Sequence, residues 1–174
     1  MSRALIEQNL QLLAQARALL DALDDERFAG PRGDGGREAG VGPHLRHCID
    51  FYRCFLRDLP RGRIDYDRRE RELDLERRTE AARAAIAAIE AALGEVTPDD
   101  RRLDVRVDTA PDEDPETAWS GSSLSRELRF LVSHTVHHYA LIAQRLRAGG
   151  FDPGASFGVA PSTLAFWSEQ DAAG

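Results

Sequence analysis

The sequence contains no lysine, only two cysteines and no long apolar run. All 23 basic residues among the 174 are arginines, against 30 aspartates and glutamates, which leaves a net charge of −7. This charge does not provide the basic face typical of nucleic-acid-binding proteins, so we expect no nucleic-acid partner. No apolar stretch approaches the roughly 18 residues of a membrane-spanning helix, so we expect no membrane insertion.

The two cysteines, Cys48 and Cys54, are too few for a disulfide framework. They lie six residues apart in one expected helix, where they would point in different directions and not pair. The N-terminal residues from Met1 to Gln8 are too polar for the apolar centre of a signal peptide. We therefore expect a reduced cytoplasmic protein.

Apolar residues recur at helical spacing in four segments, which predicts four amphipathic helices. These segments cover residues 2–23, 43–59, 79–93 and 124–146, with Ser2 and Thr79 as the N-caps of the first and third. The pattern predicts an all-α four-helix bundle. We expect a single domain over residues 1–174, with its core bundle at about 3–148 and a tail over 151–174. A short helix near Ser162–Ser168, anchored by aromatic residues of the tail, is expected within that tail.

The connections between the expected helices are long, so their lengths do not impose an up-down-up-down order. Residues 61–78 carry many charges of both signs. This segment is either a solvated loop with local ion pairs or a structured cover for one end of the domain, anchored by Ile64 and Tyr66. Leu103–Val107 alternates apolar and polar residues, which predicts a short strand or β-hairpin before the last long helix.

The five histidines fall into two short segments, one in each of two expected helices. His134 and His138 are four residues apart, so both rings lie on one helix face and can reach one cation at about 2.0–2.1 Å. His137 lies about 100° around the helix from His138, too far to join that pair. His44 and His47 are about 60° apart, so one ring can enter the core while the other lies at its edge.

Two histidines from one helix and one from another would supply three neutral nitrogen ligands. Such a set leaves a coordination position open for water or substrate, as in catalytic metal sites. The alternative is a metal-free bundle whose histidines are satisfied in its core. Glu127 lies two turns before His134 on the same face and is a candidate general base or water-bridged ligand. Asp50 follows His47 by three residues and could orient an imidazole; the alternative for each acid is a surface carboxylate.

The segments Gly42–Asp50 (GPHLRHCID) and Ser133–Tyr139 (SHTVHHY) resemble the histidine motifs of the DinB/YfiT-like superfamily. The resemblance extends over about residues 3–148. It implies a bacterial four-helix protein that binds one divalent metal through His47, in the His-Cys-Ile-Asp context, and through the His134/His138 pair. His44, Asp50 and His137 are then expected to flank these ligands.

The resemblance implies a narrow range of functions. Some members are thiol-dependent S-transferases, and others have no known activity. The chain is therefore expected to be a metal-dependent transferase or hydrolase acting on a small molecule, with a low-molecular-weight thiol as a candidate cofactor. The alternative is a non-catalytic metal-binding protein of stress response or interaction. Three imidazoles suit Zn, Ni or Fe as the metal. Relatives are often homodimers, so a homodimer is a further expectation.

Overall fold

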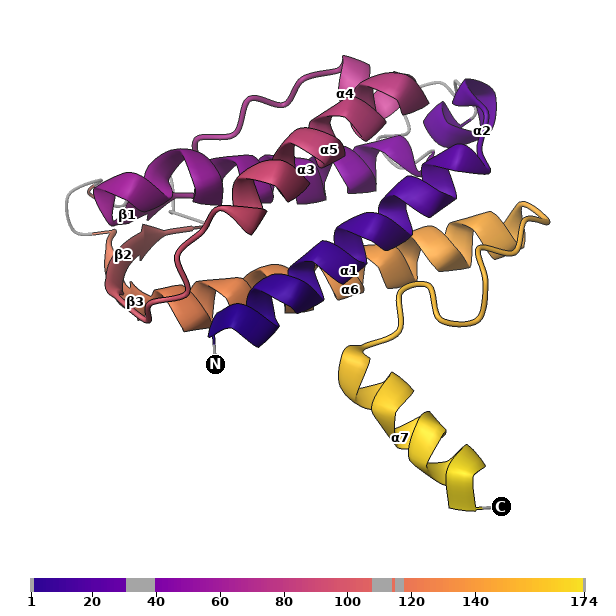
Figure 1. Cartoon of the computed structure of the whole chain (residues 1–174). Helices are drawn as coiled ribbons and strands as arrows, with labels where there is room; N and C mark the ends of the chain where they lie inside the picture. The colour runs from indigo at the N-terminus through magenta and orange to yellow at the C-terminus, as the bar shows by residue number, and fades with distance from the viewer. Residues whose placement is uncertain (1, 31–39, 108–113, 115–117, 174) are drawn as a thin grey trace.

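The computed structural model describes residues 2–30, 40–107, 114 and 118–173. Four long helices form the bundle that the sequence predicts, and shorter elements connect them (Figure 1). The long helices are α1 (Ser2–Asp21), α3 (Gly42–Asp58), α5 (Thr79–Gly94) and α6 (Leu124–Ala148). Within the described part of the chain, no helix combines the length and apolar character needed to cross a bilayer.

The long helices surround one apolar core, and each packs against two neighbours. Both α1 and α3 contact α5 and α6. In Figure 1, α1 and α6 run in one direction, whereas α3 and α5 run in the other. Because α3 and α5 are parallel, the chain between them must travel back along the bundle, and residues 62–78 make this return.

A buried hydrogen-bond network aligns α1, α3 and α6 beside the histidines. The Tyr52 hydroxyl on α3 donates to Asn9 Oδ1 on α1 at 2.7 Å and accepts from the Thr135 hydroxyl on α6 at 3.3 Å. Asn9 Nδ2 donates to the backbone carbonyl of Leu128 at 3.1 Å. A fully paired polar network specifies one alignment, because displacing any member would leave a buried polar group without a partner. Since His134 adjoins Thr135, this network also fixes where the α6 histidines lie.

The charged connection after α3 combines the two interpretations of residues 61–78: it is anchored by buried side chains, and many of its charged residues are exposed and form ion pairs. It contains η1 (Leu59–Arg61), β1 (Arg63–Asp65) and α4 (Asp74–Arg77). Ile64 and Tyr66 are buried, as expected of residues that anchor the segment. Burying these two side chains brings the segment against the end of the bundle where α6 begins.

A small three-stranded sheet closes this end of the bundle. β2 (Arg102–Arg106) forms where the alternating pattern predicts a strand, and it pairs antiparallel with β3 (Ser120–Ser123) directly before α6. The expected strand pair before the last long helix is therefore confirmed. The third strand, β1, pairs in parallel with β2 on its other side. It was not predicted from the sequence, because its partner strand begins almost forty residues later in the chain.

Two helix N-termini after α1 are capped by neighbouring aspartates. α2 (Asp25–Ala29), which the sequence did not predict, begins after Asp24, whose Oδ1 accepts from the Arg27 backbone N–H at 2.7 Å. Asp25 Oδ1 accepts from the backbone N–H of Thr79 at 2.7 Å and from its hydroxyl at 2.8 Å. The N-cap predicted at Thr79 is therefore wrong: Thr79 is the first residue of α5, and α2 caps that helix.

The C-terminal tail contains one helix, α7 (Pro161–Ala173), which is longer than the sequence predicts. Phe157 before it is buried and stacks on Tyr139 of α6, with ring centroids 4.8 Å apart. Phe166 and Trp167 on α7 are 55% and 45% exposed, so the expectation that they anchor the tail is wrong. Phe157, which is also among the aromatic residues expected to anchor the tail, makes the anchoring contact, and α7 projects away from the bundle (Figure 1).

Candidate metal centre

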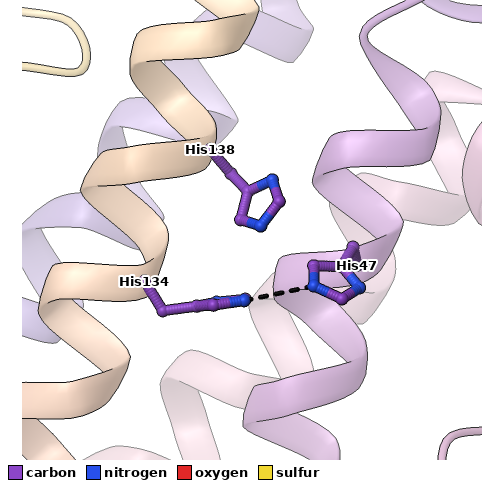
Figure 2. A group of neighbouring side chains, drawn as sticks. All are labelled: His47, His134 and His138. Atoms are coloured by element: carbon purple, nitrogen blue, oxygen red, sulfur yellow. Dashed lines mark hydrogen bonds between the residues drawn. The ribbon is translucent and has the colours of Figure 1, made fainter. Parts of the chain in front are cut away.

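Three histidines from two packed helices converge on one point of the bundle. Ser123 caps α6, its Oγ accepting from the Arg126 backbone N–H at 3.3 Å, and the helix then continues through 25 residues. His134 and His138 project from one face of this helix, one turn apart. α3 packs against α6 and presents His47 opposite them (Figure 2).

The ring nitrogens of these histidines have the spacing of a shared ligand set. His134 Nε2 lies 3.1 Å from His47 Nε2, and one nitrogen from each ring lies within 4.8 Å of the others. Two nitrogens held by one tetrahedral zinc at about 2.0–2.1 Å are roughly 3.3 Å apart. The observed separation of the two Nε2 atoms matches this value, so the cluster is compatible with metal binding.

The environment keeps all three imidazoles in the form that binds metals. Burial, followed by the charge of neighbouring imidazoles, lowers the pKa of His47 and of His134 to about 4 and the pKa of His138 to about 3. The rings are therefore neutral at pH 7. A metal-binding imidazole must have a free lone pair on one nitrogen, so the donor set fits a divalent cation of borderline softness.

His44 and His137 both contact His138 at the edge of the cluster. His44 Nδ1 lies 3.1 Å from His138 Nδ1. This contact occupies the Nδ1 atom of His138, which leaves its Nε2 for the cluster. His137 is exposed, and its ring packs edge-on against His138 with centroids 5.2 Å apart. His44 can therefore orient a member of the cluster through a hydrogen bond, whereas His137 makes only a ring contact.

Aromatic side chains enclose the cluster on the side of the small sheet. Phe51 stacks on His134, with centroids 4.1 Å apart, and contacts His47 edge-on at 4.9 Å. Phe130 lies 5.7 Å from His134, and Tyr66 stacks on Phe51 at 5.2 Å. These rings bury part of His134, whose Nδ1 is buried without a hydrogen-bond partner among the described residues. The hydrogen-bonding capacity of His134 is therefore used only at Nε2, inside the cluster.

Glu127 lies beyond this aromatic layer and is fully buried. Its Oε2 accepts from the Tyr66 hydroxyl at 2.9 Å, and its Oε1 accepts from the Ser122 hydroxyl and from Arg126 Nη1 at 2.5 Å and 2.8 Å. Seven helical residues separate Glu127 from His134, a rise of about 10.5 Å along α6. Through these hydrogen bonds, Glu127 joins Tyr66 and Ser122 to α6 at the end of the bundle. Its role as a general base stays a prediction.

Asp50 is also buried, but its carboxylate lies with arginine. Asp50 Oδ2 accepts from Arg46 Nη1 at 3.0 Å, and Arg46 Nε donates to Glu76 of α4 at 2.7 Å. This arrangement ties α3 to α4. The carboxylate of Asp50 bonds to Arg46 and to no histidine among the described residues. The prediction that Asp50 orients an imidazole therefore has no supporting contact.

Some residues beside the cluster were not identified from the sequence. Phe130 precedes His134 by four residues and therefore shares its helix face. Helical spacing alone could have identified it. Arg69 lies in the segment between β1 and α4, and its guanidinium lies over Phe51, 5.4 Å from the ring centroid. No local pattern could identify Arg69, because tertiary contacts alone bring its segment to α3.

The fold and the cluster agree with the comparison of the chain with known proteins. The sequence matches the family model described as the DinB superfamily over residues 8–142. No curated protein and no solved structure matches the chain. The matched span includes the three clustered histidines and nearly all of the four-helix core. The chain therefore belongs to the DinB superfamily.

Proposed function

We propose that this DinB-superfamily protein binds one divalent metal through His47, His134 and His138. The observation that carries the proposal is the convergence of three neutral imidazoles from α3 and α6, with two Nε2 atoms 3.1 Å apart. Zinc, nickel and iron all accept such ligands, and their availability would decide which one is bound.

We further propose that the metal serves a reaction of the thiol-dependent S-transferase or hydrolase type. A divalent metal held by three imidazoles lowers the pKa of the water or thiol that it binds, which supplies a nucleophile near neutral pH. The protein's own residues would arrange this site. His44 would hold the ring of His138 in place, and Phe51 and Phe130 would shield His134 from water. Glu127 is not assigned a catalytic step in this proposal, because both of its carboxylate oxygens are hydrogen-bonded at the end of the bundle.

The metal site is tested by elemental analysis of the purified protein and of single-histidine variants. We expect about one equivalent of metal in the wild type and a large loss in His138→Ala, because removing one of three ligands weakens binding strongly. His137→Ala is the matched control, since it removes the neighbouring ring and should retain the metal. A metal-free wild type, or an unchanged metal content in His138→Ala, would contradict the proposal.

Turnover is tested separately with the metal-loaded protein. Electrophiles are screened with bacillithiol, mycothiol or glutathione as the thiol, and hydrolysis is screened with water alone. We expect product formation that disappears in His138→Ala. Persistent inactivity of a metal-loaded protein would contradict the enzymatic proposal and favour a non-catalytic role in stress response or interaction.

A further inference from the structure

One arginine at the histidine cluster lacks a carboxylate partner. The Arg69 guanidinium lies over Phe51, and the ring of Phe51 lies 4.1 Å from that of His134. The Nε of Arg69 is buried and has no hydrogen-bond partner, and its guanidinium forms no ion pair with any residue in the described ranges. A buried N–H donor without a partner is unfavourable, since it is withdrawn from water without compensation.

Three arginines of α3 near this segment are paired with carboxylates. Arg46 Nη1 lies 3.0 Å from Asp50 Oδ2, and Arg53 Nη1 lies 2.9 Å from Glu72 Oε2. Arg57 Nη2 lies 2.7 Å from Asp58 Oδ2. These ion pairs join α3 to the segment that contains Arg69 or lie within α3. Arg69 differs from these three arginines, because it lies over Phe51, the ring that stacks on His134, and has no carboxylate partner among the described residues.

The cluster consists of three imidazoles, in a chain of net charge −7. The ligand set contains no carboxylate. Three neutral imidazoles would leave the full charge of a divalent cation unbalanced, so an anionic ligand suits this site better than a neutral or cationic one.

We infer that Arg69 recognises the carboxylate of a small anionic molecule that binds at the three-histidine cluster. The inference rests on the proposed metal-binding function and assigns its substrate class. A guanidinium matches a carboxylate through two parallel N–H···O bonds, so Arg69 provides geometric selectivity as well as charge. The guanidinium carbon lies 5.4 Å from the centroid of the Phe51 ring, within the range of a cation–π contact.

Cobalt-loaded protein tests this inference by binding alone. The probes are mercaptoacetate, which carries a carboxylate, and 2-mercaptoethanol, a neutral thiol of similar size. Dissociation constants are measured from the cobalt absorption spectrum. We expect the ratio of the mercaptoethanol constant to the mercaptoacetate constant to fall about tenfold in Arg69→Gln, which corresponds to the loss of one charge-assisted contact. Comparing this ratio between the wild type and the variant cancels the intrinsic preference of cobalt for either thiol.

Arg68→Gln is the matched control, because it removes the same charge from the exposed neighbouring position. An unchanged ratio in Arg69→Gln, or an equal fall in Arg68→Gln, would overturn the inference while leaving the metal site intact. A wild type that binds no cobalt would overturn the proposed function and this inference with it. If Arg69→Gln does not hold cobalt, the measurement is repeated with Arg69→Met, which keeps the apolar stem over Phe51. An unchanged ratio in Arg69→Met would equally overturn the inference.

Discussion

The ring nitrogens of the histidines differ in their partners, and this difference separates their roles. His47 and His134 face each other through Nε2, whereas His138 meets His44 through Nδ1. For His138 to bind a metal through Nε2, its Nδ1 must carry the proton. This N–H then donates a hydrogen bond to Nδ1 of His44. A hydrogen bond of this kind fixes the tautomer and the orientation of a metal-binding imidazole.

We therefore expect His44→Ala to weaken metal binding about 10- to 100-fold without abolishing it, which is the usual cost of losing the group that orients a ligand. Competition with a chelator of known affinity measures the change. His44→Asn can still accept a hydrogen bond and should lose less. If His44→Ala bound the metal as tightly as the wild type, His44 would be only a neighbour of His138.

At the scale of whole elements, local pattern predicts the four long helices and tertiary contacts decide the rest. α6 was predictable because its apolar and histidine positions repeat at helical spacing over many turns. β1 was not, because its three residues gain their structure only by pairing with β2. Likewise, helical spacing identified the His134/His138 pair, whereas Arg69 reaches the cluster through the folding of a connecting segment that has no periodic signal.

Tyr66 connects that segment to α6 through one hydrogen bond, which makes the connection testable. Burial and the Glu127 carboxylate raise the pKa of Tyr66, so the hydroxyl remains a donor at neutral pH. We expect Tyr66→Phe to lower the free energy of unfolding by about 1–3 kcal/mol, because a fully buried carboxylate loses a partner. Urea denaturation measures the loss.

Tyr139→Phe is the matched control for this change. Its hydroxyl donates to the neutral backbone carbonyl of Leu12 at 3.0 Å, so the same substitution should cost less there, about 1 kcal/mol. Metal content should be unchanged in Tyr66→Phe, since the hydroxyl points to Glu127 and not to a histidine. Equal losses in the two variants would show that the charge of Glu127 adds nothing to the contact.

When no metal is bound, the histidine cluster lowers the free energy of unfolding of the whole protein at acidic pH. The three imidazoles have a pKa of about 3 to 4 in the folded protein, against about 6.5 in an unfolded chain. Between these values the unfolded chain binds more protons than the folded one, so stability rises with pH across this window. The metal-free protein should therefore lose stability as the pH falls from about 6.5 towards 4.

The slope of stability against pH identifies the histidines responsible. In the presence of a chelator, His134→Gln should show a shallower slope between pH 4 and 6.5 than the wild type, because one ring that resists protonation has been removed. The exposed His137 supplies the control, and His137→Gln should retain the wild-type slope. Carboxylates such as Asp58, whose pKa is lowered by Arg57, lose their contribution only below the pH window of the histidines. A wild-type slope in His134→Gln would mean that His134 takes up a proton in the folded state as readily as in the unfolded chain, which would contradict its lowered pKa.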